Sequence, residues 1–250
     1  MVHLKTSEEI QIMKECGKKL MQALDELIPM IKPGITTLKI DEEAERLIEK
    51  YGAKSSFKRV QGYSWTTCLP INEQVVHTPP GSRVVKDGDV LTLDIGAFYK
   101  GFHTDYATTI IVGSKKDPKV EAFLETGKKT LDKALEVAQK ARYIGEISKI
   151  IEEEIYGHGY FILKDLTGHG IGHELHEDPY VPNFLDRPVE KTFKIKEGLV
   201  IAVEVIYSMG TEEIAYEKKG EWSIRSKDNS LCGCFEKTIA FEDENRCILT

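Results

Sequence analysis

The chain has 250 residues, 41% apolar and 30% charged, as expected for one globular domain with a large core. Its formal net charge of −7 argues against a nucleic-acid binder, which would need a basic face to neutralise phosphates. Five cysteines are not needed as disulfides at this size, so we expect reduced thiols and a cytoplasmic location. We see neither a signal peptide nor an apolar run long enough to cross a bilayer, so we expect no membrane contact.

The first part of the chain is predicted to form two helices. Thr6 can cap the first helix, because Glu9 follows it at the spacing of a capping box, and Pro29 marks the end of the apolar stripe. A second helix is predicted over roughly residues 38–51 from its apolar spacing.

The period then changes to that of strands and later returns to that of helices. Residues 84–95 and 103–112 are predicted strands, separated by a turn around residues 99–101. Asp117 is a good N-cap for a helix that runs to about residue 141, and another helix is predicted over roughly residues 146–156.

The two halves of the chain, roughly residues 1–113 and 114–250, resemble each other. Residues 86–95 match residues 196–205 at an offset of 110, and the same offset takes Glu15-Cys16-Gly17-Lys18-Lys19 onto Glu125-Thr126-Gly127-Lys128-Lys129. Two copies are too few for a solenoid. We therefore predict one α+β domain built from a duplicated helix–helix–β-hairpin unit, with a central antiparallel sheet and a pseudo-twofold axis.

Asp94 and Asp105 lie on the two arms of the predicted hairpin, and we expect them to be opposed or nearly so. Two carboxylates across a ladder repel each other unless a cation lies between them. Both could instead point to solvent or pair with lysines. Because Leu91, Leu93 and Ile95 occupy the other face, Asp94 belongs to a polar face that favours a metal site.

Glu204 and Glu236 interrupt strongly apolar strands. Glu204 lies within the continuous apolar run 199–206, typical of a strand buried on both faces. An ionised carboxylate there needs a cation or strong donors, and the alternative is a protonated, hydrogen-bonded acid. The repeat also places Asp94 and Glu204 at equivalent points, so both carboxylates should reach one central site.

Three histidines occur within eight residues, at His169, His173 and His176, and glycines flank the first of them. Those glycines suit a ligand presented from a tight loop and argue against a zincin helix. A structural histidine cluster is the alternative, but buried acids elsewhere in the chain favour a metal site.

The charges of these groups suggest how many ions they bind. Four carboxylates carry about −4, which two divalent cations neutralise and one cation does not. Oxygen ligands with one imidazole suit Mn²⁺, Fe²⁺ or Co²⁺, with Zn²⁺ a further candidate. Two ions about 3.5–4 Å apart would activate water, so the expected chemistry is hydrolysis.

The motifs together resemble those of the type I methionine aminopeptidases over essentially the whole chain. They are Asn72-Glu73-x-x-x-His77, Asp94-Ile95-Gly96, Gly101-Phe102-His103-x-Asp105, Gly168-His169-Gly170-Ile171-Gly172, Glu204 and Phe235-Glu236-x-Thr238. The resemblance implies the pita-bread fold and a substrate peptide or nascent protein that begins with Met.

The resemblance also implies the role of each metal ligand. Asp94 would bind one ion, His169 and Glu204 the other, and Asp105 and Glu236 would bridge both. Glu204 would in addition shuttle the proton of the attacking water.

Other positions match substrate-binding residues of the family. His77 and His176 would contact the substrate backbone and help to stabilise the tetrahedral intermediate. Tyr63, Cys68 and Trp222 would line the methionine side-chain pocket.

The chain departs from the common bacterial pattern at four positions. Phe57, Val60 and Leu175 stand where Cys, Tyr and Phe are expected, and Lys237 replaces the His that commonly follows the last metal-binding Glu. The first three changes concern the preference of the pocket, and all four leave the metal ligands intact.

Two rival functions are weighed against this one. A proline-specific aminopeptidase or dipeptidase of the same fold normally carries an N-terminal domain, whereas this chain begins almost directly with the catalytic unit. A non-catalytic binding relative would typically have lost metal ligands, and all five are present. We further expect a monomer, and ribosome association is an added hypothesis.

Overall fold

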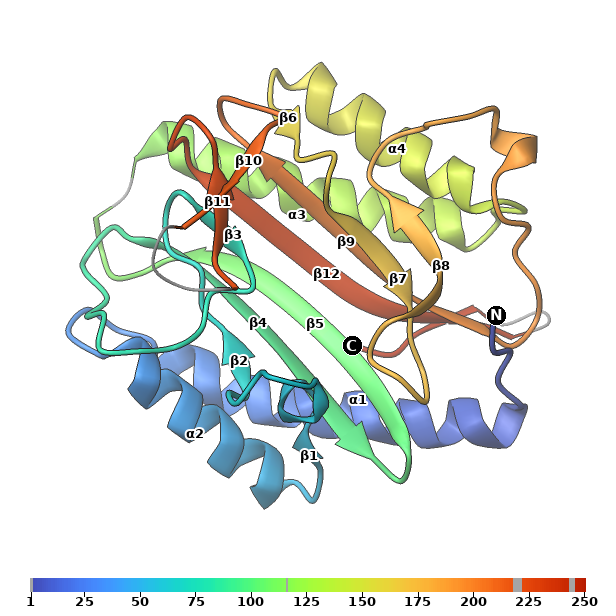
Figure 1. Ribbon diagram of the computed structural model, residues 1–250, viewed down its shortest axis with the longest axis horizontal. Helices are drawn as coiled ribbons and strands as arrows, with labels where there is room; N and C mark the ends of the chain where they lie inside the picture. Colours follow the sequence, from blue (N-terminus) through green and yellow to red (C-terminus); the bar gives the residue numbers. More distant parts are fainter. Residues whose placement is uncertain (1, 116, 218–221, 243–245) are drawn as a thin grey trace.

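The computed structural model describes residues 2–115, 117–217, 222–242 and 246–250 (Figure 1). Within these residues, no helix is both long and apolar enough to span a membrane. The helices longer than one turn are α1 (Ser7–Leu27), α2 (Thr37–Lys50), α3 (Pro118–Ala138) and α4 (Ile144–Gly157).

The strands of the described residues form two sheets. They are β1 (Lys54–Ser55), β2 (Thr67–Cys68), β3 (Gln74–Val76), β4 (Val90–Tyr99), β5 (Phe102–Ile111), β6 (Phe161–Ile162), β7 (Thr167–Gly170), β8 (Glu177–Pro182), β9 (Leu199–Ser208), β10 (Ile214–Tyr216), β11 (Ile224–Ser226), β12 (Cys232–Phe241) and β13 (Arg246–Ile248). The large antiparallel sheet has the order β1-β4-β5-β12-β9-β7-β8, and β10-β11-β3 form a small one.

Both helix pairs lie on the same side of the large sheet (Figure 1). Leu91, Leu93 and Ile95 of β4 pack with α1 and α2, while Val203 and Val205 of β9 pack with α3 and α4. Because side chains alternate along a strand, the residues between these apolar positions point to the opposite face of the sheet. That second face carries the candidate site.

The helix starts confirm the predicted caps. The Thr6 hydroxyl accepts a hydrogen bond from the Glu9 amide at 3.2 Å, and the Glu9 carboxylate accepts one from the Thr6 amide at 2.8 Å. Asp117 caps α3 through the Lys119 amide at 2.9 Å. In each case a side chain satisfies an amide that the helix itself leaves unpaired.

The predicted duplication appears in the order of elements. Helix α1 corresponds to α3, α2 to α4, and β4 to β9, while β4-β5 and β9-β12 meet in the middle of the sheet. Gly88 and Gly198, which match at the offset of 110, both have positive φ, at 90° and 84°. Each is the last residue of the turn before its strand, and β4 begins at Val90 and not at the predicted residue 84.

Asp94 and Asp105 lie nearly opposite each other across the hairpin, as predicted, with an offset of two residues. Asp94 pairs with Ala107, and Asp105 pairs with Gly96, so the two acids lie diagonally across the ladder and not directly opposite each other. The reason is the turn, which consists of Lys100 and Gly101, both at positive φ. The shift is an even number of residues, so both acids still share one face.

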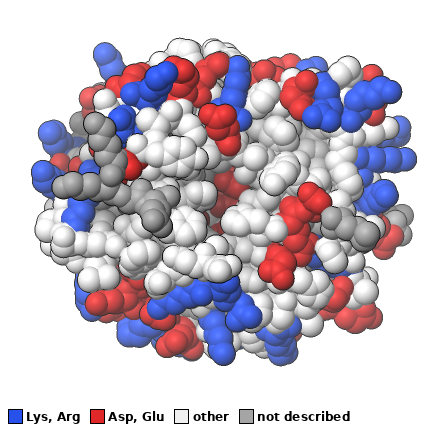
Figure 2. Space-filling model, in the orientation of Figure 1, with Lys and Arg blue, Asp and Glu red and all other residues white. Residues whose placement is uncertain are grey.

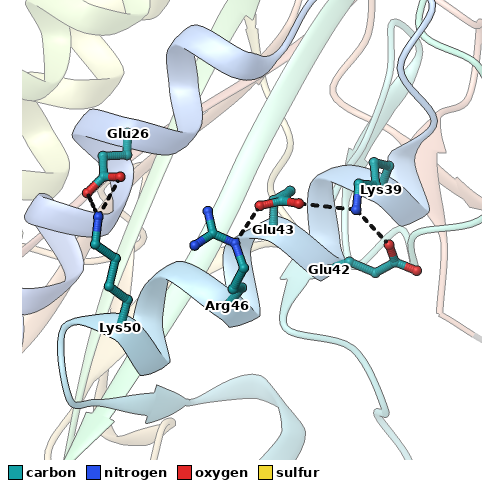
Figure 3. Close-up of polar contacts among 6 residues, drawn as sticks. All are labelled: Glu26, Lys39, Glu42, Glu43, Arg46 and Lys50. Atoms are coloured by element: carbon teal, nitrogen blue, oxygen red, sulfur yellow. Dashed lines mark hydrogen bonds and ion pairs between the residues drawn. The ribbon is translucent and has the colours of Figure 1, made fainter.

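The outer surface of α1 and α2 carries exposed ion pairs (Figure 3). Lys50 bridges to Glu26 between the helices, and Glu43 lies between Lys39 and Arg46 along α2. Such solvent-exposed pairs contribute little to stability. They belong to the helix layer, on the face of the sheet opposite the candidate site.

Candidate active site

Five neighbouring strands each place one predicted metal ligand on the same face of the sheet. Glu236 of β12 pairs directly with Glu204 of β9 and, on its other side, with Ala107 of β5, which is opposite Asp94 of β4. His169 of β7 pairs with Ala202, two residues from Glu204. Asp105 completes the set from β5. The sequence-predicted ligands therefore converge, because the pleat points every second residue to one side.

The imidazole of His169 is oriented for ligation. Its Nδ1 lies 2.9 Å from the Gly170 carbonyl oxygen, which can only accept a hydrogen bond, so Nδ1 carries the proton. The unprotonated Nε2 then faces the acids and lies 3.4 Å from Oε1 of Glu204. Asp105, His169 and Glu236 each offer one ligand atom, and these three atoms lie within 4.8 Å of one another. This buried group can hold a metal ion.

The carboxylates of the site are costly to ionise without a cation. Burial raises the pKa of Asp94 to about 7. Burial together with the neighbouring acids raises the pKa of Asp105 and Glu236 well above the ordinary range, and that of Glu204 also rises well above it. Among the described residues, Oε1 of Glu236 is buried without a hydrogen-bond partner. A divalent cation would satisfy that oxygen and offset the repulsion.

Asp105 is held in place by two threonines, Thr238 and Thr250. The Thr238 hydroxyl accepts from the Asp105 amide at 3.0 Å and donates to the Asp105 carbonyl at 2.9 Å. The Thr250 hydroxyl donates to the same carbonyl at 3.0 Å. Thr238 stood in a quoted motif, but only the fold brings Thr250 to the site.

The ligands form one end of a cavity of about 220 Å³ that opens on the sheet face. Figure 2 shows a hollow near the centre of this face with acidic atoms at its floor. The cavity is lined by Phe57, Val60, Tyr63, Cys68, Val76, His77, Asp94, Asp105, His169, Leu175, His176, Glu204, Trp222 and Glu236. Every predicted site residue is therefore brought together, and Val76 is a lining residue that the sequence did not indicate.

Two further histidines border the metal-ligand group. The ring of His176 meets that of His169 edge to face, with centroids 4.4 Å apart. Desolvation lowers the pKa of His77 to about 4 and also lowers that of His176, so both rings are neutral near pH 7. His77 adopts the left-handed backbone region at φ 56°, which is costly for a residue other than glycine. A neutral imidazole can donate one hydrogen bond and accept another, as an acyl-transfer site requires.

The other end of the cavity is apolar. Tyr63 donates its hydroxyl proton to the Thr67 carbonyl at 2.8 Å, and its ring packs edge to face on Trp222 at 5.3 Å. Phe57 and Leu175 are buried beside them. Lys237 lies on the opposite face of β12 from Glu236, as strand alternation requires, so it is outside this cavity.

A duplicated α+β fold with a buried Asp–His–Glu group beside an apolar pocket is typical of a metal-dependent hydrolase. Known sequences give the assignment within that class. The model of metallopeptidase family M24 matches residues 11–243. Methionine aminopeptidase 1 of Bacillus subtilis is 37% identical over 250 residues, covering 100% of this chain and 99% of that protein. The chain belongs to metallopeptidase family M24 and, within it, to the methionine aminopeptidases.

Solved structures agree with this assignment. The crystal structure of methionine aminopeptidase from Thermotoga maritima has a TM-score of 0.94 at 33% identity, covering 100% of this chain and 99% of that chain. Prolidase from Pyrococcus furiosus has a TM-score of 0.76 at 24% identity, and the match covers 99% of this chain but 65% of the prolidase. The prolidase shares the fold and is the more distant of the two. The predicted pita-bread architecture is confirmed.

Proposed function

We propose that this protein hydrolyses the peptide bond after an N-terminal methionine in peptides and proteins. The observation that carries the proposal is the adjacency, in one cavity, of a buried Asp–His–Glu group and an apolar pocket. Full-length relatives named for this activity support the same substrate.

The residues of the site fit divalent metal ions. Three observations support a metal site: the unpartnered Oε1 of Glu236, the orientation of the His169 ring and the hard oxygen–nitrogen donor set. Bound divalent ions would polarise the scissile carbonyl and lower the pKa of water. We infer two ions, of Mn²⁺, Fe²⁺ or Co²⁺ with Zn²⁺ as a further candidate, held by Asp94, Asp105, His169, Glu204 and Glu236. Equilibrium dialysis tests the number, because one ion per chain at saturation would contradict it.

The chain's own groups supply the proton transfers and the orientation of the substrate. The Glu204 carboxylate would take the proton of the attacking water and later pass it to the leaving amine. His77 and His176 would donate hydrogen bonds to the substrate backbone and to the oxyanion that develops. Both rings are neutral near pH 7, so each has one N–H for this purpose.

The apolar end of the cavity selects the side chain. Tyr63, Cys68 and Trp222 form one wall, and Phe57, Val60 and Leu175 complete the lining. A flexible thioether fills an irregular apolar pocket of this kind well. We therefore assign methionine to this pocket.

The direct test compares two peptides on metal-loaded protein. Release of methionine from Met-Ala-Ser should exceed cleavage of an X-Pro peptide, because the pocket recognises the first side chain. The opposite preference would favour the proline-specific rival. A loaded protein that cleaves neither peptide would favour the non-catalytic binding relative.

The place of action follows from the substrate. Proteins receive their first methionine at the ribosome, so we propose that the enzyme acts on nascent chains in the cytoplasm, near the ribosome. We further propose that it is a monomer. Co-sedimentation with ribosomes and light scattering measure these two properties.

A further inference from the structure

A fully buried ion pair links the N-terminal segment to the active-site side of the sheet. Nζ of Lys5 lies 2.5 Å from Oε2 of Glu177, and the two side chains are only 1% and 4% exposed. Nζ also donates to the His3 carbonyl at 2.8 Å, and the Lys5 amide donates to the Gly198 carbonyl at 2.7 Å. A pair buried this deeply is expensive to desolvate, and removal of one partner leaves an uncompensated buried charge.

Glu177 stands at the base of the β7–β8 hairpin. It pairs with Gly170, the residue that follows the candidate ligand His169, and it follows directly after His176. Its second oxygen, Oε1, accepts from the Glu174 amide at 3.1 Å. One carboxylate therefore fastens both Lys5 and the loop of the hairpin.

Lys5 also packs against the loop from inside. A Cβ built on Gly172 would lie 2.0 Å from Cε of Lys5 and 2.6 Å from its Nζ, so the lysine side chain lies directly against the backbone of the loop. The Gly172 carbonyl accepts from the His103 amide at 2.8 Å, which ties the other side of the loop to β5. The loop is thus fixed between the N-terminal segment and the central sheet. In Figure 1 the N-terminal segment lies beside the large sheet.

This loop carries two residues of the cavity. Leu175 and His176 both line it, and the ring of His176 contacts that of His169. A displacement of the loop would move the wall of the side-chain pocket and the hydrogen-bond donor together. A misplacement of about 1 Å can cost about 100-fold in rate.

We infer that Lys5 is a positioning residue of the active site, which holds the loop 171–176 through its buried ion pair with Glu177 so that Leu175 and His176 meet the substrate. This role rests on the proposed function for its kinetic consequence. The positioning itself is a property of the loop and can be measured without substrate.

The test uses Lys5→Met in the full chain, with Lys14→Met as the matched control. Lys14 also makes a 2.5 Å ion pair near the start of the chain, with Glu242, but its side chain is 30% exposed. Amide hydrogen exchange at residues 172–176 should quicken at least about tenfold in Lys5→Met and remain unchanged in Lys14→Met. In metal-loaded protein, kcat/KM for Met-Ala-Ser should fall about 10- to 100-fold only in Lys5→Met.

Metal affinity separates positioning from collapse of the site. Binding of Co²⁺ should stay within about threefold of the wild type, because the five ligands are not altered. Lys5→Met leaves Glu177 buried and unpaired, so the double variant Lys5→Met/Glu177→Leu is measured as well. It should recover most of the lost melting temperature while kcat/KM stays low, because the loop has still lost its anchor.

Unchanged exchange in a folded Lys5→Met protein would overturn the inference, and so would full recovery of kcat/KM in the double variant. If Lys5→Met does not fold, the double variant alone decides by the same two readouts. If wild-type protein releases no methionine while exchange still quickens in the variant, the proposed function fails and the positioning role stands.

Discussion

Glu204 and Glu236 face each other directly across β9 and β12, and both carboxylates are buried in the same cavity. Like charges in this arrangement repel each other strongly in a medium that excludes water. The metal-free fold therefore keeps protons on these acids, as the raised pKa values of both indicate. Divalent cations can replace those protons, which couples metal binding to the stability of the sheet.

Glu236→Gln tests the assignment of this acid as a metal ligand. Loss of one partner of a buried charge pair costs about 3–5 kcal/mol, so Co²⁺ affinity should fall about 100-fold or more. The metal-free variant should melt within about 3 °C of wild type, because a protonated Glu and a Gln have the same shape and charge. Calorimetric titration and melting curves measure both effects. Glu242→Gln is the surface control, and metal affinity unchanged in Glu236→Gln would contradict the assignment.

The stabilisation conferred by metal should depend on pH. The pKa of Asp94 is raised by burial to about 7, against about 3.9 for a free Asp. Because the folded-state pKa is the higher one, the stability contributed by this group is fully present below about pH 4 and is lost as the pH rises through about 7. The rise in melting temperature on saturation with Mn²⁺ should therefore be larger at about pH 7.5 than at about pH 5.5.

The same experiment has a built-in control. Glu236→Gln should give a smaller metal-dependent rise in melting temperature at both pH values, because one of the proposed metal ligands is gone. A rise that is equal at the two pH values in wild type would show that the buried acids are not the metal ligands.

His77→Asn probes a hydrogen-bond donor without disturbing the backbone. His77 has φ 56°, a region that Asn tolerates much better than Ala does, so Asn is the cleaner replacement. Loss of one donor to a developing oxyanion costs about 100-fold or more in kcat, with metal affinity unchanged. Steady-state kinetics on Met-Ala-Ser measures this change, and His158→Asn at the exposed end of α4 is the control. A loss confined to KM would show that His77 only binds the substrate.

Leu175→Ala tests the wall of the side-chain pocket. Leu175 is 6% exposed and lines the cavity, so its truncation should lower kcat/KM for methionine peptides about tenfold, mainly through KM. For peptides with a bulkier first residue, kcat/KM should fall less. The control is Leu38→Ala on the exposed face of α2. Equal losses for all first residues would indicate that Leu175 does not contribute to selectivity.

Features governed by neighbouring residues could be predicted from the sequence. The caps at Thr6 and Asp117 depend on a side chain and an amide only two or three residues apart. The candidate ligands were recognisable because acids inside apolar strands, such as Glu204, are costly without a cation. The duplication then indicated that Asp94 and Glu204 would meet.

Features that depend on tertiary packing could not be predicted. The exact register of the hairpin depends on the turn, in which Lys100 adopts a positive φ that is unusual for Lys. The contacts of Lys5 with Glu177 and of Thr250 with Asp105 join residues 172 and 145 positions apart. Nothing in their local sequences indicates such partners, so these contacts emerged only from the fold.

The central claim is that bound divalent metal enables this chain to release N-terminal methionine. The most direct measurement follows free methionine from Met-Ala-Ser by mass spectrometry, first with chelator-treated protein and then after loading with Mn²⁺ or Co²⁺. No release is expected without metal, and loading should restore it, with Glu236→Gln remaining inactive at metal concentrations that saturate the wild type. Methionine release by metal-free protein, or none by protein shown to bind metal, would contradict it.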